Sequence, residues 1–314
     1  MKSISIIGGG AWGRALAITF ASKCKVELYV MPFDPDVNDT RIETRHDLNQ
    51  IRDASCIFLV VPSNAIRDVC NKLKTILTKP CTLVICSKGV EVGTGKFMSE
   101  VVTELLPTNK IAILSGPNFA SEISKGLPAL TSIVSEDIAL ARDLANSLST
   151  ETFRLLPSTN VLIAQLFGTT KNVLAMLCGV ARGLGLGNNF VASLITKGVN
   201  EMLELAKHKG IAGAERILEP AGIGDIFLTC NGQESRNQKF GLELVSQYLG
   251  QHYKDIHMTT TVESISTIEA LQAWKTKTPI LCSFAHELIA GKYTTQDEVK
   301  ERFVGLVLSK AITL

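Results

Sequence analysis

Short runs of β-branched and other apolar residues alternate with amphipathic stretches along the first half of this 314-residue chain. The runs have the length of buried strands, and the stretches between them have helical periodicity. The predicted strands are Ser3–Ile7, Val26–Val30, Cys56–Val61, Thr82–Cys86, Ile111–Leu114 and Thr131–Val134, followed by a seventh candidate at Phe153–Leu156. The predicted helices include Ala11–Ala21, Asn64–Leu77 and Gly95–Leu106. This alternation predicts a Rossmann-like, doubly wound α/β fold, with a mainly parallel sheet covered on both faces.

After Pro157 the pattern changes to long apolar periodicities with almost no alternation. The predicted helices are Val161–Gly183, Asn189–Lys209, Gly213–Leu218, Arg236–Leu249, Val262–Trp274, Ser283–Gly291 and Asp297–Leu308. A chain of this length can bury two separate cores. We therefore predict two domains, a sheet domain over residues 1–157 and an all-α C-terminal domain over residues 158–314.

Composition excludes several classes of partner. The chain is 46% apolar and 20% charged with a formal net charge of +2, and no basic tail or stripe predicts nucleic-acid binding. The apolar run at the amino terminus is too short for a signal peptide, which favours a cytoplasmic protein. Val161–Gly183 has the length of a membrane span, but Gln165, Lys171 and Asn172 would be costly in lipid. We interpret it as a core helix.

Eight cysteines are scattered through the sequence, mostly within apolar runs. They form no C-x-x-C pair and lie near no cluster of histidines, so the pattern is not typical of a structural metal site. We interpret them as reduced core residues and predict no metal.

The segment GGGAWG, residues 8–13, follows the first predicted strand and opens the first predicted helix. In the dinucleotide-binding pattern Gly8 permits the tight turn, Gly10 lets a pyrophosphate approach the backbone, and Gly13 lets the helix close on the strand. Three glycines can also form a simple turn. The strand before them and the helix after them favour a dinucleotide site.

The acidic residue that usually ends the second strand and holds the adenosine ribose of NAD is absent from that position. Val26–Val30 runs into Met31, and the first acid, Asp34, comes only after a proline-containing turn. Arg41 and Arg45 are interpreted as solvated loop arginines, with the 2′-phosphate of NADP as an alternative partner. The sequence predicts NAD or NADP without separating the two.

Two loops follow predicted strands at the carboxyl edge of the sheet, where doubly wound folds bind their ligands. Lys88 lies between Ser87 and Gly89, so its cation could hold a phosphate or a substrate oxygen. The alternative is a surface lysine in a turn. Ser115–Ala120 has a glycine-proline corner that presents backbone N–H groups and the amide of Asn118, and its alternative is a rigid turn that starts a helix.

Lys171 and Asn172 lie in the middle of Val161–Gly183, a stretch so apolar that most of it must be buried. Burial removes hydration from a lysine and lowers its pKa, so Lys171 is a candidate base. The alternative is a lysine whose stem packs on the helix while its ammonium reaches water.

Asp225 follows a glycine-rich segment, and Thr229 comes four residues later. A carboxylate near Lys171 would orient its ammonium, although Asp225 also suits the N-cap of the helix pattern behind it. Further along, Ser235 and Arg236 precede a helix, where backbone N–H groups and a guanidinium can bind phosphate. A capping serine followed by a solvated arginine would give the same pattern.

Eight motifs in order resemble the NAD(P)-dependent glycerol-3-phosphate dehydrogenases of the bacterial type. They are IIGGGAWGRALA (residues 6–17), VVPSNAI (60–66), SKGVE (87–91), SGPNFASEISKGLP (115–128), QLFGTTKNVLA (165–175), LITKGVNEM (194–202), AGIGDIFLTC (221–230) and SRNQKFG (235–241). The resemblance extends from the first strand to near Gly291. It implies a dinucleotide-binding domain over residues 1–157 and a helical substrate-binding and catalytic domain over residues 158–314.

The resemblance implies an enzyme that interconverts dihydroxyacetone phosphate and sn-glycerol 3-phosphate with NAD or NADP and supplies glycerol 3-phosphate for phospholipid synthesis. Its implied catalytic residues are Lys171 as general base, with Lys88 and Asp225. The implied substrate contacts are Lys88, Gly116, Asn118, Lys171, Asn172, Asp225, Thr229, Ser235, Arg236 and Asn237. The implied cofactor contacts are Gly8, Gly10, Ala11, Trp12, Gly13, Met31, Lys88, Ala120, Arg236, Thr261 and Glu263. A homodimer is also implied.

The chain departs from the family pattern mainly where adenosine binds. The segment between the second strand and Cys56 is shorter than is usual in the family, and Met31 occupies a position where histidine or arginine is common. The family's Val-Glu-Gly becomes Val262-Glu263-Ser264, which keeps the carboxylate but stiffens the loop. Two other hypotheses stay open: a related dehydrogenase acting on a small keto acid, and a catalytically idle protein that senses dinucleotides.

Overall fold

The computed structural model describes residues 1–32, 34, 37–51, 54–232, 234–257, 262–271, 274 and 279–309. The chain forms two compact units. The sheet unit comprises residues 1–91, 96–165 and 216–225, and the helical unit comprises residues 92–95, 166–215 and 226–314. The domain boundary expected after residue 157 stays a prediction.

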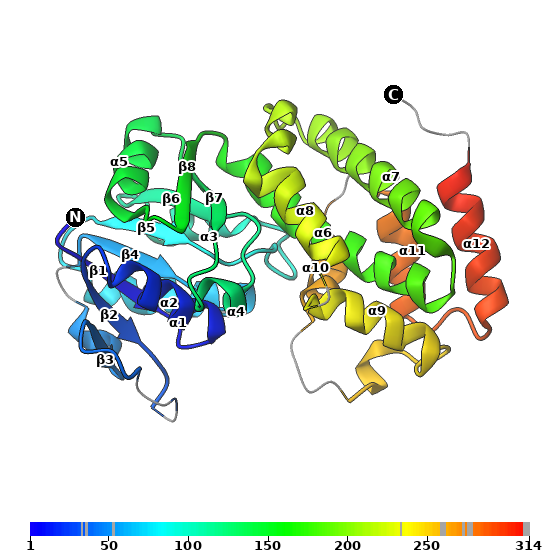
Figure 1. The fold of residues 1–314 in the computed structure, drawn as a ribbon, viewed down its shortest axis with the longest axis horizontal. Coiled ribbons are helices and arrows are strands. Elements are labelled where there is room, and N and C mark those ends of the chain that lie inside the picture. The colour runs from blue at the N-terminus through cyan, green and yellow to red at the C-terminus, as the bar shows by residue number, and fades with distance from the viewer. Residues whose placement is uncertain are drawn as a thin grey trace. The chain divides into compact units, whose positions relative to one another are not determined.

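The described residues of the sheet unit form one eight-stranded sheet in the order β3-β2-β1-β4-β5-β6-β7-β8 (Figure 1). Neighbouring strands are parallel except β6 and β7, which are antiparallel. The strands are β1 Ser3–Ile7, β2 Lys25–Tyr29, β3 Ile42–Arg45, β4 Cys56–Leu59, β5 Thr82–Ile85, β6 Lys110–Ser115, β7 Ala129–Val134 and β8 Phe153–Ser158. The predicted doubly wound, mainly parallel sheet is confirmed.

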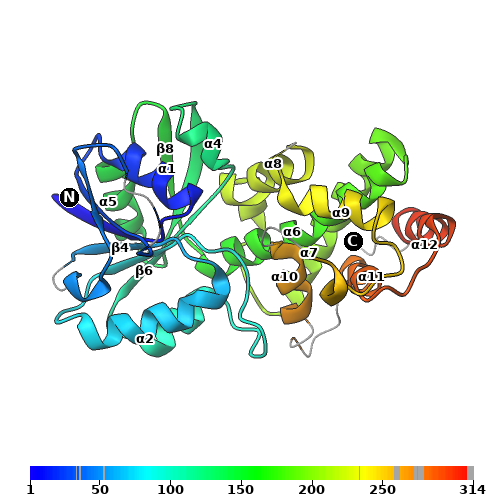
Figure 2. The same ribbon diagram turned by 90° about the horizontal axis from the view of Figure 1, so that it is seen from below.

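Helices cover both faces of this sheet. The helices of the sheet unit are α1 Ala11–Phe20, α2 Ile66–Ile76, α3 Met98–Leu105, α4 Ala120–Ile123 and α5 Ile138–Leu148. Buried side chains of α1 and α5 join the core on one face, and those of α2 and α3 join the core on the other. Figure 2 shows α2 on the opposite side of the strands from α1 and α5.

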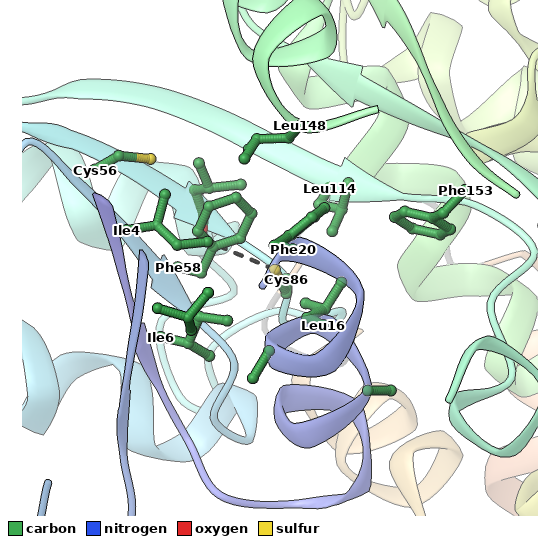
Figure 3. Packing of buried hydrophobic residues seen from close by; sticks show 14 of the residues in the cluster. Ile4, Ile6, Leu16, Phe20, Cys56, Phe58, Cys86, Leu114, Leu148 and Phe153 are labelled. Carbon is green, nitrogen blue, oxygen red and sulfur yellow. Dashed lines mark hydrogen bonds between the residues drawn. The ribbon is translucent and has the colours of Figure 1, made fainter. Parts of the chain in front are cut away.

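Alternating strand residues supply the two cores because successive side chains point to opposite faces of a sheet. Ile4 and Ile6 of β1 belong to the core under α1, whereas Ile7 belongs to the core on the other face. Figure 3 shows Phe20 of α1 beside Phe58 of β4, with ring centroids 5.3 Å apart. A fully buried side chain of this size contributes about 1.5–3 kcal/mol to stability.

Two features of the sheet differ from the sequence predictions. The connection after β2 was expected to hold no strand, but Ile42–Arg45 forms β3 at the sheet edge. Arg45 is therefore a strand residue and not the loop arginine that was expected. Pro157 lies inside β8 and not at its end, which is tolerated because β8 is the opposite edge strand.

The described chain beyond β8 forms helices and connecting loops, which confirms the all-α second half. The α-helices are α6 Val161–Gly183, α7 Gly187–His208, α8 Asp225–Asn231, α9 Arg236–Ser246, α10 Glu263–Leu271, α11 Ile280–Ile289 and α12 Gln296–Leu308. Short 3-10 turns occur at Ala214–Leu218 and Tyr253–Asp255, and a π-helical turn at Pro220–Gly224 precedes α8.

Helix α6 begins in the sheet unit and carries Lys171 further along. Asn160, with a positive φ of 73°, caps its first turn by accepting the N–H of Ile163 at 3.3 Å. The buried side chain of Gln165 bonds twice to Ser99 of α3, accepting its N–H at 3.0 Å and donating to its hydroxyl at 2.7 Å. These contacts fix the position of the first turns of α6 on the sheet unit.

Helix α6 is also the one described helix that is long and apolar enough to cross a membrane. However, 94% of its most apolar 18-residue window is buried inside the fold. Such burial is typical of a core helix and fits our interpretation of this segment.

Candidate active site

The glycine turn between β1 and α1 has the geometry that a bound dinucleotide requires. Gly8 has a φ of 127°, and a methyl group there would lie 2.2 Å from the carbonyl oxygen of Val60. A methyl group on Gly13 would lie 1.9 Å from the carbonyl oxygen of Gly8, so α1 could not approach β1 as closely. Around Gly10 the space is open to 4 Å. The first and third glycines are required by the fold, and the second leaves room for a ligand.

The N-terminus of α1 is suited to a pyrophosphate. Gly10 is its N-cap, and no side chain in the described part of the chain caps it or places an acid in its first turn. Its leading N–H groups, which include those of Ala11 and Trp12, can therefore serve an anion. Arg14 adds a cation whose Nε donates to the carbonyl of Gly9 at 2.6 Å. Arg14 was not predicted as a site residue, although it lies in the first family motif.

The other predicted cofactor contacts on the sheet unit are Met31 and Ala120. Met31 follows β2 and is well exposed, and Ala120 is the first residue of α4. The acid that was absent from the end of β2 is present nearby, because the proline-containing turn brings Asp34 back toward the glycine turn. Its Oδ2 atom accepts the N–H of Met31 at 3.2 Å and would lie 2.9 Å from a methyl group on Gly9.

Lys88 follows β5 and forms an ion pair with Asp225. Its Nζ lies 2.6 Å from Oδ2 of Asp225, whose side chain is 2% exposed. The lysine is partly exposed, but its removal would leave the buried carboxylate of Asp225 without this counter-charge, so the ion pair favours the present position of both groups. Gly89, with a φ of 124°, turns the chain immediately after the lysine.

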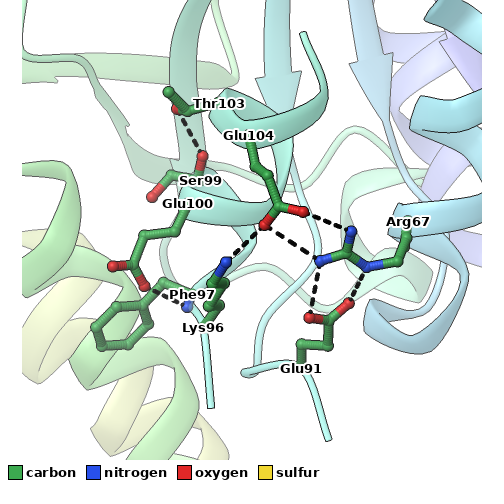
Figure 4. Close-up of polar contacts among 8 residues, drawn as sticks. All are labelled: Arg67, Glu91, Lys96, Phe97, Ser99, Glu100, Thr103 and Glu104. Atoms are coloured by element: carbon green, nitrogen blue, oxygen red, sulfur yellow. Dashed lines mark hydrogen bonds and ion pairs between the residues drawn. The ribbon is translucent and has the colours of Figure 1, made fainter. Parts of the chain in front are cut away.

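A charged network anchors the segment that follows Lys88 (Figure 4). Arg67 of α2 lies 2.7 Å from Glu91 and 2.9 Å from Glu104 of α3, and Lys96 lies 2.6 Å from Glu104. The Arg67 hydrogen bond, followed by that of Lys96, lowers the pKa of Glu104 to about 2. Single exposed ion pairs contribute little, but this network ties two helices to both ends of the Val90–Phe97 hairpin.

The loop after β6 presents Gly116 and Asn118. A methyl group on Gly116 would lie 2.4 Å from the hydroxyl oxygen of Thr131, so the loop contacts β7 closely. Asn118 donates to the same hydroxyl at 2.9 Å. Its own Oδ1 is buried and has no hydrogen-bond partner within the described residues. An orphaned acceptor of this kind suits a substrate hydroxyl.

Lys171 is buried in the helical unit with a polar partner. Its side chain is 4% exposed, and Nζ donates to the hydroxyl of Thr229 on α8 at 2.6 Å. The alternative of an ammonium that reaches water is therefore wrong. The expected lowering of its pKa stays a prediction.

A chain of amide hydrogen bonds adjoins Lys171. Asn172 donates to Oε2 of Glu263 on α10 at 3.0 Å and accepts from Asn237 on α9 at 3.2 Å. Asn237 in turn accepts the N–H of Ser264 at 2.9 Å. The guanidinium of Arg236 lies 3.5 Å from Oε1 of Glu263. Five polar residues from α6, α9 and α10 thus form one network.

The start of α9 contains the residues of the predicted anion site, and anion binding there stays a prediction. Ser235 is its N-cap and accepts the N–H of Gln238 at 3.4 Å, while the side chain of Arg236 is 54% exposed. Arg182 of α6 bonds to the first turn of α9 and to the end of α8. It donates to the side chain of Gln238 at 2.6 Å and to the carbonyl of Cys230 at 2.9 Å. The serine caps the helix and the guanidinium is accessible, which is what the alternative of a capping serine and a solvated arginine expected.

All eight cysteines are free thiols, and seven of them are buried. Cys178 of α6 and Cys230 of α8 lie together, and the hydrogen bond with Cys178, followed by burial, raises the pKa of Cys230. The Cys230 thiol therefore stays neutral and is a poor nucleophile beside Thr229. No group of three or more metal-ligating side chains occurs among the described residues.

Comparison with known proteins decides the family. Residues 3–141 match the family described as NAD-dependent glycerol-3-phosphate dehydrogenase N-terminus, and residues 160–300 match its C-terminus. A glycerol-3-phosphate dehydrogenase [NAD(P)+] from Rhodospirillum rubrum is 36% identical over 95% of this chain and 90% of its own length. The chain belongs to the NAD-dependent glycerol-3-phosphate dehydrogenase family.

Two further matches extend over nearly whole chains of the same family. The glycerol-3-phosphate dehydrogenase [NAD(P)+] of Hyphomonas neptunium is 33% identical over 99% of this chain and 98% of its own. A crystal structure of glycerol-3-phosphate dehydrogenase from Coxiella burnetii aligns with a TM-score of 0.83 at 28% identity, covering 96% of this chain and 98% of that one.

The structure groups the residues that the family resemblance singles out. In the sheet unit Lys88 meets Asp225, and in the helical unit Lys171 meets Thr229. Glu263, an implied cofactor contact, bonds to Asn172 and lies 3.5 Å from Arg236. Thr261 lies outside the described residues.

Asp225 differs from its predicted alternative role. It is the first residue of α8 and has a helical φ of −70°, so it is not an N-cap, and its carboxylate bonds to Lys88. Its expected effect on Lys171 stays a prediction, as do the catalytic and binding roles of all these glycerol-3-phosphate dehydrogenase residues.

Proposed function

We propose that this chain interconverts dihydroxyacetone phosphate and sn-glycerol 3-phosphate with NAD(H) or NADP(H), supplying glycerol 3-phosphate for phospholipid synthesis. Family membership supports this activity. The observation that carries it is Lys171, a buried ammonium bonded to Thr229 and followed by the amide network of Asn172. A buried proton donor next to polar groups of fixed orientation suits carbonyl reduction.

The nicotinamide, when bound, supplies or accepts the hydride at C2 of the substrate. The residues of the chain do the rest. Lys171 gives a proton to the C2 oxygen in the reducing direction and takes it back in the oxidising direction, while Thr229 orients its ammonium. Lys88, held by Asp225, stabilises negative charge that develops on the substrate oxygen. Gly116 and Asn118 contact the substrate hydroxyl groups.

The phosphate of the substrate binds at the start of α9. Backbone N–H groups behind Ser235 lie at this end of the helix, and Arg236 adds a charge suited to a phosphate. Asn237 supports this end through its bonds to Asn172 and Ser264. Binding energy gained at the phosphate fixes the position of C2, so a substrate without phosphate reacts slowly. A keto acid lacks this anchor, which makes the related keto-acid dehydrogenase the weaker alternative.

The activity is tested by following the loss of NADH and NADPH absorbance with dihydroxyacetone phosphate and, separately, with small 2-keto acids. We expect turnover with the phosphorylated ketone and competitive inhibition by glycerol 3-phosphate. Turnover with keto acids alone would favour the related dehydrogenase. Binding of NADH without turnover of any of these substrates would favour the dinucleotide-sensing protein.

Replacing Arg236 by alanine should raise the KM for dihydroxyacetone phosphate about 10- to 100-fold, because a charge-assisted hydrogen bond to phosphate is lost. The turnover number should change less, since the guanidinium acts at a distance from C2. Steady-state kinetics at fixed ionic strength measures both. Lys239→Ala removes the same charge from an exposed position on the same helix and should leave the KM unchanged. An unchanged KM in Arg236→Ala would contradict the phosphate site.

A cytoplasmic location and a homodimer belong to the same proposal. Both are implied by the family resemblance, and sedimentation of the purified chain over a range of concentrations would measure the oligomeric state.

A further inference from the structure

Asp34 lies beside the glycine turn although it comes after the end of β2. The carboxyl end of β2 is bound to this turn, because Gly8 donates its N–H to the carbonyl of Tyr29 at 2.9 Å. The chain then folds back over Met31, whose N–H donates to Oδ2 of Asp34 at 3.2 Å. As a result Oδ2 would lie 2.9 Å from a methyl group on Gly9. The carboxylate therefore contacts the segment that would hold the pyrophosphate.

NAD-binding Rossmann folds hold the adenosine ribose with an acidic residue near the carboxyl end of the second strand, and Asp34 lies beside that end here. A carboxylate has about four acceptor positions, and the N–H of Met31 uses one of them. Asp34 is also partly exposed, so a ligand can reach its side chain. The remaining acceptor capacity of the carboxylate suits the vicinal hydroxyl groups of a ribose.

The described arginines of the same connection are already neutralised by acids. Arg41 forms two hydrogen bonds with the carboxylate of Asp39, at 3.0 and 2.7 Å. Arg45 lies 2.5 Å from Glu43. A 2′-phosphate at this place would have to compete with these acids for either guanidinium.

Arg45 is also on the wrong face of the sheet for the glycine turn. It is in register with Tyr29, so its side chain shares the face of Tyr29. Val30, the next residue, packs on Gly9 from the opposite face. A third cation, Arg14, is bound to the carbonyl of Gly9 and would serve the pyrophosphate that both cofactors share.

We infer that Asp34 makes this chain selective for NAD(H) over NADP(H). Its carboxylate accepts a hydrogen bond from the adenosine ribose of NAD(H) and repels the 2′-phosphate of NADP(H). The inference rests on the proposed function, because it assumes that the glycine turn binds a nicotinamide dinucleotide. In this chain the acid is not at the end of β2 itself. Asp34 comes later in the sequence, and the turn after β2 brings it back to the strand end.

The test is direct binding of NADH and NADPH, measured by fluorescence titration of the wild-type chain and the Asp34→Asn variant without substrate. The wild-type protein should bind NADH at least about 100-fold more tightly than NADPH, since like charges disfavour the second complex. In Asp34→Asn the amide oxygen can still accept the N–H of Met31, but the charge is gone. The preference should fall to about 10-fold or less, mainly through tighter binding of NADPH.

Asp47→Asn is the matched control. It removes the same charge from the same connection, where Asp47 caps a 3-10 turn by accepting the N–H of Asn49. This variant should keep the wild-type preference for NADH. Wild-type protein that binds NADPH as tightly as NADH would overturn the inference. Equal weakening of both cofactors in Asp34→Asn would also overturn it, because it would show that Asp34 only shapes the turn.

The binding test is independent of the proposed activity. Selective binding of NADH together with no turnover of dihydroxyacetone phosphate would defeat the proposed function and leave the role of Asp34 intact. Turnover of dihydroxyacetone phosphate with NADPH as efficiently as with NADH would support the proposed function and defeat the role of Asp34.

Discussion

Replacing Lys171 by methionine should lower the turnover of dihydroxyacetone phosphate about 10²- to 10⁴-fold, the usual contribution of a positioned proton donor. Methionine fills a similar volume, so the effect should come from the missing ammonium and not from a cavity. Lys171→Ala should lose at least as much. Binding of NADH should persist in both variants, because the predicted pyrophosphate site is formed by the glycine turn of the sheet unit.

Lys197 of α7 provides the control for a buried lysine. It is as buried as Lys171, and its Nζ lies 3.5 Å from the hydroxyl of Ser309. Lys197→Met should therefore change stability but leave the turnover of the folded protein within about threefold of wild type. Near-normal turnover in Lys171→Met would show that another group supplies the proton.

The second large effect is expected for Gly241→Ala, which should lower the free energy of unfolding by about 3 kcal/mol or more. Gly241 lies where α9 crosses α6, and a methyl group on it would be 1.9 Å from the carbonyl oxygen of Met176. Gly179 makes the reciprocal close approach, since its methyl group would be 2.0 Å from the carbonyl oxygen of Gln238. Moving α9 away would also break the bond between Asn172 and Asn237.

Gly305→Ala separates this steric effect from helix propensity. Gly305 lies inside α12, and a methyl group there meets no atom within 4 Å. Alanine should stabilise that helix by about 0.5–1 kcal/mol, a gain that the clash at Gly241 outweighs. Urea unfolding followed by circular dichroism measures both variants. Equal stability of Gly241→Ala and wild type would mean that α6 and α9 do not cross this closely.

The sheet and the helical half could be predicted because their core residues form regular patterns over short stretches of the sequence. Alternating apolar runs mark both faces of a covered sheet, and the apolar length of Val161–Gly183 marks a core helix. The strand Ile42–Arg45 escaped prediction because an edge strand needs only one buried side chain, here Ile42. Helix α11 begins at Ile280, three residues before the predicted start at Ser283, because Pro279 acts as its N-cap.

Site residues could be predicted where a single residue differs in polarity from its neighbours in the sequence. Contacts between segments that are distant in the sequence could not be predicted. Lys171 was found because a cation interrupts an apolar stretch. The pairing of Lys88 with Asp225 joins residues 137 positions apart, and no local pattern reveals such a contact. The place of Asp34 was not predictable for the same reason, because the direction of the turn after Met31 depends on contacts with the glycine turn.

The most direct test of the account is a crystal structure of the chain with NAD and glycerol 3-phosphate bound. We predict that Nζ of Lys171 lies about 2.6–3.2 Å from the C2 oxygen of the substrate, the reach of a general base. The same structure should show the phosphate at the start of α9, contacted by Arg236. A substrate bound with its C2 oxygen out of reach of Lys171 would contradict the account.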